Sequence, residues 1–433
     1  MNPKQFLRGL SWLVVLNLLV KPLWVFGIDR KVQNEVGHEA YGTYFSILNL
    51  AIILAIIADA GLSNLLNRQL ALQERMAVRS LLRLKAGLSA LYLLVFCGIC
   101  WITGVTRWDL VLLVGTLQVL SSFFVFFRNI LTGYQQFRAD AWLSVTDKAL
   151  TLLVCAPLLY LPFGGGLSLT GFLWIQAGST LVALLVALFL ARRHHEGPAQ
   201  GAGLGEVLQL SAPFVLVILL QGAHTRLDAF LLERLHPQGA LEAGIYAAAY
   251  RLLDAANTLG FMTASFLVPF VARHLSDEAL IDRTVLRLRH ALLATGALFA
   301  GGCAAAAPFV NELLYHTSAP YPAQVLALCV AVLPAYYGIH LYGSLLSASG
   351  RLGYFAGTMG ACVALNAALN AALIPRYGAA GCCVAALASQ YTAALLLFAG
   401  ARRRFSLRVH PLSLVACLAA GAAAFGAGWW LFR

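Results

Sequence analysis

Charged residues are scarce in this sequence of 433 residues, and their scarcity excludes an ordinary soluble domain. Asp, Glu, Lys and Arg make up 11% of the chain, whereas a typical soluble domain carries roughly 25%. Hydrophobic residues account for 60%, and the mean hydropathy is +0.78. This composition indicates a polytopic membrane protein.

Long polar segments are also absent. No loop is large enough for a soluble catalytic domain, and the sequence contains no P-loop or ATPase domain. The nine cysteines lie in apolar stretches without nearby His, Asp or Glu. We therefore expect a protein that is not an enzyme, that needs no cofactor or metal, and that uses its cysteines for packing. The cations behind the net charge of +12 are dispersed over short loops, which argues against a nucleic-acid partner.

Apolar runs take up most of the chain. Each is about 20 residues long, the length that crosses a hydrocarbon core of roughly 30 Å, and none alternates like a strand of an outer-membrane barrel. The sequence predicts an all-α fold, because a spanning segment must satisfy its own backbone hydrogen bonds. The predicted spans, about thirteen, are near 7–28, 41–66, 84–104, 109–131, 143–163, 167–191, 209–233, 243–271, 290–313, 322–349, 353–374, 378–400 and 411–432.

Lys and Arg concentrate in one set of connections, and this predicts the orientation because cytoplasmic loops hold an excess of them. The N-terminus is then inside and, with thirteen spans, the C-terminus outside. We expect the basic stretches 68–85 and 273–290 to lie along the membrane surface. The predicted cytoplasmic cations are Arg68, Arg75, Arg79, Arg83, Lys85, Arg273, Arg283, Arg287, Arg289, Arg402, Arg403, Arg404 and Arg408.

Two halves of similar length are predicted. A connection rich in Gly and Pro lies near the middle of the chain, and Gly-x-Tyr opens both the second span, at Gly42, and the eighth, at Gly244. Such a repeat predicts two six-helix lobes, and transporters commonly bind substrate between their halves. The expected divisions are an N-lobe at 1–191, a cytoplasmic linker at 192–208, a C-lobe at 209–400 and an additional C-terminal helix at 401–433.

Among the cations inside predicted spans, three stand out: Lys21 in the first, Arg226 in the seventh and Arg251 in the eighth. An Arg or Lys at the centre of a bilayer costs about 2.5 to 3.5 kcal/mol on insertion scales, so such residues face a cavity or a partner. Counting at about 1.5 Å per residue puts all three at a similar depth. We therefore predict a cationic ring between the lobes that selects an anion carrying phosphate or carboxylate.

Local ion pairs are an alternative for part of this charge. Arg251 and Asp254 are spaced i, i+3, and His224 and Asp228 are spaced i, i+4, so each pair could lie on one helix face and neutralise itself. The other two cations have no well-placed carboxylate within a turn. Those two carry the anion-binding prediction.

Four positions are candidates for gating or coupling. Asp59 and Arg68 lie near the cytoplasmic end of the second span, where Asp59 either caps a neighbouring helix or pairs with a cation when that side closes. Asp228 and Asp254 lie deeper, and Asp254 is the candidate for a protonation switch. Because no ATPase domain is present, we expect an ion gradient, of H⁺ or Na⁺, or the substrate supply to drive transport.

Other polar and small residues within the spans have structural interpretations. Asn17, His340, Asn366 and Asn370 are expected to form interhelical hydrogen bonds. The many Gly and Ala residues of the last five spans predict close contact between helices.

The opening segment 19–71 has a charged outer loop, the Gly-x-Tyr pattern, Asp59-Ala60-Gly61 near the end of the second span, and Asn67-Arg68 after it. In this combination it resembles the Wzx-type polysaccharide transporters of the multidrug/oligosaccharidyl-lipid/polysaccharide (MOP) superfamily. The resemblance implies two six-helix lobes in a V and alternating access. It also implies flipping of an undecaprenyl-diphosphate-linked oligosaccharide, the repeat unit of an O-antigen, capsule or exopolysaccharide, across the bacterial inner membrane.

The resemblance extends to site residues and partners. Cations lining the central cavity of that family handle the lipid-linked glycan, and the matching positions are Lys21, His224, Arg226 and Arg251. Membrane lipids, a polysaccharide polymerase and glycosyltransferases are the partners that it implies.

Three alternatives stay open. A lipid II flippase shares the cationic cavity but usually has two extra helices, and only one extra span is predicted here. A MATE-type multidrug or cation antiporter would need acids facing cationic drugs, and the first span offers Lys21 instead. A membrane scaffold or enzyme of cell-surface assembly is the alternative outside transport.

Overall fold

The computed structural model describes residues 16–17, 19–63, 66, 70, 78–161, 166–192 and 204–408, the last range with side chains from residue 212. Every regular element in these ranges is a helix. Ten of the helical stretches are long and apolar enough to cross a membrane. The predicted all-α membrane architecture is confirmed.

The predicted count of thirteen spans is not confirmed. The first predicted span is described only from residue 16, and the last, 411–432, lies outside the described residues. One of the ten stretches, Leu352–Phe405, contains two predicted spans. The predicted gating residue Arg68 also lies outside the described residues.

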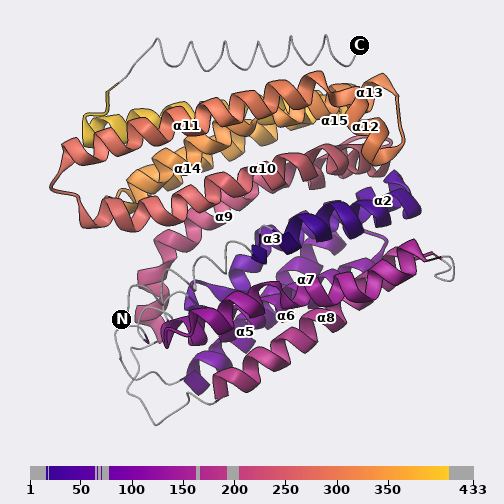
Figure 1. The fold of residues 1–433 in the computed structure, drawn as a ribbon, viewed down its shortest axis with the longest axis horizontal. Helices are drawn as coiled ribbons and strands as arrows, with labels where there is room; N and C mark the ends of the chain where they lie inside the picture. Colours follow the sequence, from indigo (N-terminus) through magenta and orange to yellow (C-terminus); the bar gives the residue numbers. More distant parts are fainter. Residues whose placement is uncertain are drawn as a thin grey trace. The chain divides into compact units, whose positions relative to one another are not determined.

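The chain forms two compact units, Met1–Leu219 and Leu220–Arg433, here called unit 1 and unit 2. In unit 1, α6 and α7 both pack against α8, and α3 packs against α5 and α6 (Figure 1). Large apolar side chains such as Phe126 and Ile130 are fully buried among these helices. The elements of unit 1 are η1 (Leu23–Asp29), α2 (Arg30–Val36), α3 (His38–Asp59), α5 (Val78–Ile102), α6 (Trp108–Gly133), α7 (Phe137–Tyr160) and α8 (Leu169–Arg192).

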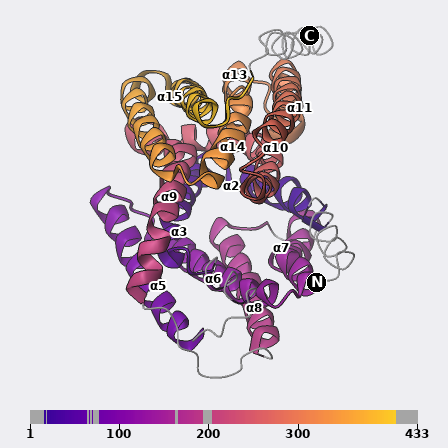
Figure 2. The ribbon, with the colours of Figure 1, turned by 90° about the vertical axis from the view of Figure 1, so that its left-hand side faces the viewer.

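Unit 2 is built around α14, which is buried along nearly its whole length and packs against α10, α11 and α15. Figure 2 looks along these helices and shows them gathered into one bundle. The helices of unit 2 are α10 (Gly239–Arg273), α11 (Glu278–Ala305), α12 (Ala307–Tyr315), α13 (Pro320–Val330), α14 (Leu333–Ala348) and α15 (Leu352–Phe405), and the division between the units falls within α9 (Leu204–Leu235).

Small residues bring the helices of unit 2 close together, as predicted. A Cβ atom added at Gly343 of α14 would lie 2.7 Å from the ring of Phe355, and one at Gly296 of α11 would lie 3.0 Å from the ring of Tyr337. Without a hydrophobic drive between helices in lipid, such close packing is a main source of association. The glycines therefore let aromatic side chains fill the spaces between backbones.

One predicted loop region is helical instead. The predicted first span ends in η1, which has π-helical geometry, and the expected outer loop after it forms helix α2 to Val36, before Gly37 takes a positive φ of 83°. The basic stretches were predicted to lie on the membrane surface. Residues 278–289 and 78–85 form the N-terminal parts of the long helices α11 and α5, and their place on the membrane surface stays a prediction.

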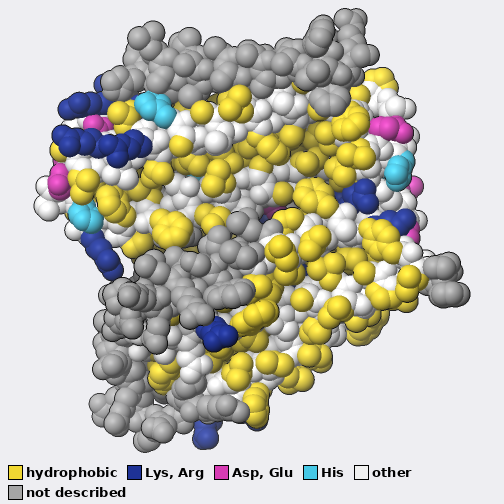
Figure 3. All heavy atoms as spheres, in the orientation of Figure 1, with side chains coloured by type: hydrophobic (Ala, Val, Ile, Leu, Met, Phe, Trp, Pro, Cys, Tyr) yellow, Lys and Arg dark blue, Asp and Glu magenta, His cyan; other side chains and the backbone are white. Residues whose placement is uncertain are grey.

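Basic side chains gather at one end of unit 2, while its flank is largely hydrophobic (Figure 3). Arg273, Arg283 and Arg287 are exposed at this end, and Arg402 and Arg403 at the end of α15 are exposed as well. This segregation fits a helical bundle whose apolar flank faces lipid. The predicted inside orientation of these residues stays a prediction.

α15 is two antiparallel helices joined at Gly378, which has φ 54° and ψ −133°. Asn366, twelve residues before the glycine, donates to Ser389, eleven residues after it. Glu242 of α10 secures the junction, because its Oε2 accepts from the backbone N of Ala379 at 2.7 Å and from Tyr321 Oη at 2.5 Å. This carboxylate satisfies a backbone donor at the start of the second helix, where no intrahelical partner exists.

We predict that Gly378→Ala destabilises the protein. A side chain there would need a backbone conformation that costs about 1–3 kcal/mol, and its Cβ would collide with the carboxylate of Glu242. The thermal unfolding temperature in detergent should fall by several degrees. Gly357→Ala on the same helix is the control, because a Cβ there meets nothing within 4 Å. Equal unfolding temperatures for the two variants would contradict this account of the junction.

Candidate functional site

The predicted site residues are divided between the units. Lys21 belongs to unit 1, whereas His224, Arg226, Arg251 and the acids near them belong to unit 2. The ring of three cations, which would draw on both units, therefore stays a prediction. Within unit 2 the structure shows which charges meet.

Arg226 of α9 forms an ion pair with Asp254 of α10. Its Nη2 lies 3.5 Å from Oδ1 of Asp254, and the two side chains are 23% and 44% exposed. Tyr250, one turn before Asp254, supports the guanidinium, whose central carbon lies 5.9 Å from the centre of the ring. Tyr250 in turn donates to the carbonyl of Thr225 at 3.1 Å. The pair is thus positioned by two helices, and part of each side chain is exposed.

Arg251 turns toward a different helix. Its Nη1 donates to Tyr315 Oη of α12 at 2.9 Å, and Tyr315 donates to the carbonyl of Ala248 at 3.2 Å. The proposed local pair of Arg251 with Asp254 is therefore wrong, because the carboxylate lies against Arg226 instead. Arg251 is buried in unit 2, so its predicted contact with substrate would require a rearrangement.

A polar cluster is buried where α9 meets the two halves of α15. Asp228 Oδ1 accepts from Asn370 Nδ2 at 2.7 Å, and the same amide lies 3.0 Å from Asn366 Oδ1. The proposed pair of His224 with Asp228 is wrong, since His224 Nε2 has no hydrogen-bond partner among the described residues. Asn366 continues the chain of contacts to Ser389 at 3.3 Å.

Gln390 completes this cluster by donating from Nε2 to the carbonyl of His224 at 2.6 Å. Within the described part of the chain, Oε1 of Gln390 and Oδ1 of Asn370 accept no hydrogen bond. The expected interhelical bonds of Asn366 and Asn370 are confirmed, as is that of His340, whose Nε2 lies 3.1 Å from Asn257 Oδ1. Sequence reasoning missed Gln390, although a Ser-Gln pair in an apolar span was a usable signal.

A second ion pair lies inside unit 1 and is here called the sealed pair, because its cation is fully buried. Lys85 of α5 was predicted to be a loop cation, which is wrong: its side chain is 0% exposed. Its Nζ lies 2.7 Å from Asp59 Oδ1, 2.8 Å from Ser122 Oγ and 3.4 Å from the carbonyl of Ala58. Asp59, at the end of α3, also accepts from the backbone N of Ser63 at 3.3 Å.

Of the two roles proposed for Asp59, pairing with a cation is observed, and the carboxylate also caps the next turn. The rings of Phe123 and Phe126 complete the enclosure, with centres 5.6 and 5.4 Å from Lys85 Nζ. Every donor of the ammonium group therefore has an acceptor, as a buried charge requires. This pair joins α3, α5 and α6.

The first described helix of unit 1 runs beside α7. Asn17 Nδ2 donates to Ser144 Oγ at 2.8 Å, which confirms the interhelical bond expected of Asn17, and Tyr160 donates to the carbonyl of Gly27 at 2.7 Å. Between these contacts lies Lys148, which sequence reasoning missed although it falls within the predicted span 143–163. Lys21 is exposed on the same first helix.

The sequence matches one protein family, described as Polysaccharide biosynthesis protein, over residues 6–275. Among curated proteins, none matches the sequence.

Several solved structures share the fold. The lipid II flippase MurJ in an inward closed conformation is similar over 97% of this chain and 98% of its own, with 10% identity and a TM-score of 0.68. An inward-facing MATE family multidrug resistance transporter of the MOP superfamily has 14% identity and a TM-score of 0.67, covering 90% of this chain and 98% of its own.

A MOP superfamily transporter from Pyrococcus furiosus Vc1 (DSM3638), described as having a binding pocket of reverse polarity, has 14% identity and a TM-score of 0.60, covering 93% of this chain and 94% of its own. At these identities the likeness concerns the fold alone, and it confirms the predicted MOP-type architecture.

We predict that removing the acid of the sealed pair lowers the unfolding free energy more than removing its cation. Asp59→Asn leaves the ammonium of Lys85 buried without a counter-charge, which should cost about 3–5 kcal/mol of unfolding free energy. Lys85→Met should cost less, because the side chain of Asp59 is 21% exposed and keeps its bond to Ser63. Thermal unfolding in detergent measures both.

The control for this comparison is Asp109→Asn, which breaks an exposed pair with Arg107 at 2.8 Å. An exposed pair contributes about 0–1 kcal/mol. A loss for Asp59→Asn no larger than that for Asp109→Asn would contradict the sealed-pair account.

Proposed function

The chain belongs to the polysaccharide biosynthesis protein family, and from this premise we propose that it is a flippase for an undecaprenyl-diphosphate-linked oligosaccharide. It would move the repeat unit of a surface polysaccharide across the bacterial inner membrane by alternating access. Glycosyltransferases that build the repeat unit and a polymerase that consumes it would be its functional partners. The N-terminus would lie in the cytoplasm and the C-terminus outside.

The observation that carries this proposal is the exposure of cations within apolar helices. Arg226 is 23% exposed on its side chain, and Lys21 is exposed on the first helix. An exposed charge cannot face hydrocarbon without a large cost, so it faces a protein partner, a water-filled cavity or a bound anion. A diphosphate is the anion that suits both residues, since Arg presents a planar fork matched to phosphate oxygens and Lys a compact point charge.

Binding of the substrate to Arg226 would change the contact between two helices. In the present structure its guanidinium lies at 3.5 Å from Asp254, a loose contact between two accessible groups. A phosphate group would compete with the carboxylate for the same fork and would repel it. Binding would thereby separate α9 from α10 at this level, and release would let the pair form again.

Asp228 is our candidate for the coupling group. It is 2% exposed and is bound by the amide of Asn370, and no ion pair to it exists among the described residues. An ionised carboxylate buried without a cation is costly, so the site would take up a proton or a small cation. Asp254 is the weaker candidate, because Arg226 already balances its charge.

We predict that Lys21→Gln and Arg226→Gln each reduce surface polysaccharide at least about tenfold, the effect of losing roughly 1.4 kcal/mol of binding. The assay is complementation of a host that lacks its own flippase, with the lipid-linked glycan expected to accumulate. The control is Arg234→Gln, two turns further along α9 and paired with Glu233 at 2.8 Å. Full complementation by the Lys21→Gln/Arg226→Gln double variant would refute the proposal, and membrane levels of each variant exclude loss of protein.

We predict that Asp228→Asn abolishes the dependence of transport on an ion gradient while exchange down a substrate gradient continues. The amide keeps the shape of the carboxyl group and its contact with Asn370 but cannot bind the coupling ion. Flux in proteoliposomes with and without a proton or sodium gradient measures this. Asp254→Asn could instead abolish the dependence of flux on the gradient while Asp228→Asn keeps it. That result would assign the coupling site to Asp254.

A further inference from the structure

Lys148 is a cation near the middle of a membrane-spanning helix. It is the twelfth residue of the 24 in α7, counting from Phe137 (148 − 137 + 1). At about 1.5 Å per residue it lies roughly 17 Å from either end, too far for its side chain to reach the interface. It therefore needs a partner or water at that depth.

The described neighbours of the Lys148 ammonium group are an aromatic ring and one acid. Its Nζ lies 4.5 Å from the centre of the Trp24 ring and 3.4 Å from Asp147 Oδ2. Consecutive residues of a helix point in different directions, so Asp147 cannot face the ammonium squarely. The side chain of Lys148 is 29% exposed, so part of it is open to a ligand.

Trp24 occupies an unusual backbone segment. It follows Pro22 and lies in the first turn of η1, seven residues with π-helical geometry, a feature that frequently occurs at functional sites. Its indole N–H is buried and has no acceptor among the described residues. An unsatisfied buried donor costs about 1–3 kcal/mol. An oxygen-bearing ligand that shifted the ring would supply the missing acceptor.

Contacts on either side of Trp24 and Lys148 hold the first helix against α7. Asn17 binds Ser144 before them, and Tyr160 binds the carbonyl of Gly27 after them. Lys21 precedes Trp24 by three residues, so the two lie on neighbouring positions of one helix face. In unit 1 the indole of Trp24 thus has the ammonium of Lys148 at 4.5 Å and Lys21 about one turn away along its own helix.

We propose that Trp24 and Lys148 form a subsite for the sugar-diphosphate junction of the substrate, with the first sugar ring on the indole and a phosphate on the ammonium. The proposal rests on the proposed function and specifies which part of the substrate unit 1 recognises. Without substrate, Lys148 covers the face of the indole as a cation–π pair. An arriving phosphate draws the ammonium away, and the freed apolar face accepts the C–H face of a pyranose ring.

This exchange predicts different roles for the two residues. Lys148 contributes to any diphosphate ligand, because a charge-assisted hydrogen bond is worth about 1.5–3 kcal/mol. Trp24 contributes only when a sugar is attached, by an amount comparable to an aromatic contact of about 0.5–1.5 kcal/mol. Loss of the indole also removes the competitor for the ammonium, so binding of a diphosphate without sugar should not weaken.

The test is a binding titration of the purified protein in nanodiscs with two probes. One probe is farnesyl diphosphate, and the other is farnesyl diphosphate carrying one N-acetylglucosamine. We expect Lys148→Gln to weaken both probes about tenfold and Lys148→Arg to restore most of the affinity. We expect Trp24→Ala to weaken the sugar-bearing probe about three- to tenfold and to leave farnesyl diphosphate within twofold of wild type.

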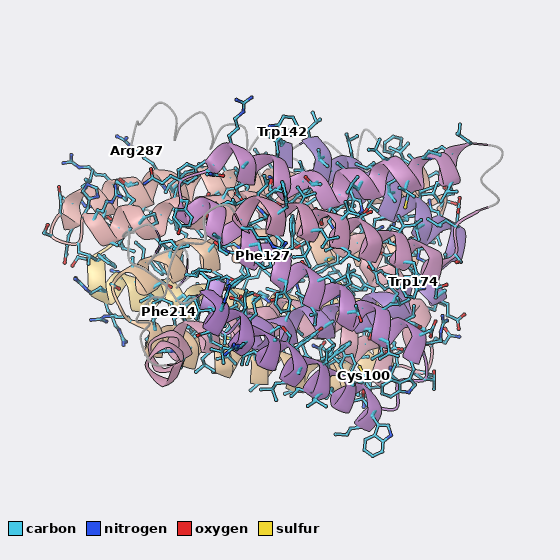
Figure 4. All side chains as sticks on the ribbon, turned by 90° about the horizontal axis from the view of Figure 1, so that it is seen from below. Cys100, Phe127, Trp142, Trp174, Phe214 and Arg287 are labelled. Carbon is cyan, nitrogen blue, oxygen red and sulfur yellow. The ribbon has the colours of Figure 1, made fainter. Side chains whose placement is uncertain are left out.

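Two matched controls come from the same unit. Lys31→Gln removes a lysine that also lies near an aromatic ring, 6.0 Å from the centre of Tyr160, and near an acid, 3.7 Å from Glu35. Trp174→Ala removes a tryptophan that is 66% exposed on α8 and is labelled in Figure 4. Both controls should bind the probes like wild type.

The outcomes separate this subsite from the proposed function. If wild type binds both probes but Trp24→Ala weakens them equally, or Lys148→Gln has no effect, the subsite is refuted while diphosphate recognition stands. If wild type binds neither probe, the subsite and the proposed substrate fall together. Thermal unfolding of each variant with no probe shows whether a lost affinity reflects a lost fold.

Discussion

A charge inside a membrane-spanning helix must be matched by a partner or by water, because hydrocarbon offers neither. The described cations of this protein meet the requirement in two ways. Lys85 is enclosed with Asp59, a serine and two aromatic rings, and Arg251 is enclosed with Tyr315. The side chains of Arg226 and Lys148 are partly exposed, by 23% and 29%, and each has an acid within 3.5 Å.

A buried ion pair and a partly exposed ion pair have different effects on the helices that carry them. A sealed pair fixes the helices that contribute to it, since opening it would leave a buried charge uncompensated. An accessible pair can exchange one partner for another at small cost. The buried charges therefore stabilise the packing within each unit, and under the proposed function the partly exposed charges are the places where an anion would alter contacts between helices. In unit 2 such an exchange would act on α9 and α10, which meet at Arg226 and Asp254.

The same distinction explains what could be predicted from the sequence. Hydropathy and span length predicted the all-α membrane fold, and polar residues within spans predicted interhelical hydrogen bonds that are present at Asn366 and Asn370. Local spacing failed for the ion pairs, because Asp254 is bound by a residue 28 positions away (254 − 226) rather than by Arg251. A periodic pattern contains no information about which neighbouring helix presents the counter-charge.

Loop assignments failed for a related reason. Lys85 lies beside other cations in the sequence, so the excess of positive charge concealed a residue that tertiary packing buries. Lys148 was missed although it lies within the predicted span 143–163, and its environment includes Trp24 of another helix. In both cases the environment of the ammonium group depends on a second helix.

The central claim is that accessible cations recognise the diphosphate of a lipid-linked glycan. It is tested most directly with purified protein in proteoliposomes and two substrates that carry the same sugar, one on an isoprenyl diphosphate and one on a neutral isoprenyl ether. A membrane-impermeant glycosidase added outside reports how fast each glycan crosses the bilayer. The account predicts that the protein accelerates crossing of the diphosphate-linked glycan and leaves the neutral one at the protein-free rate. Equal acceleration of both, or of neither, would contradict it.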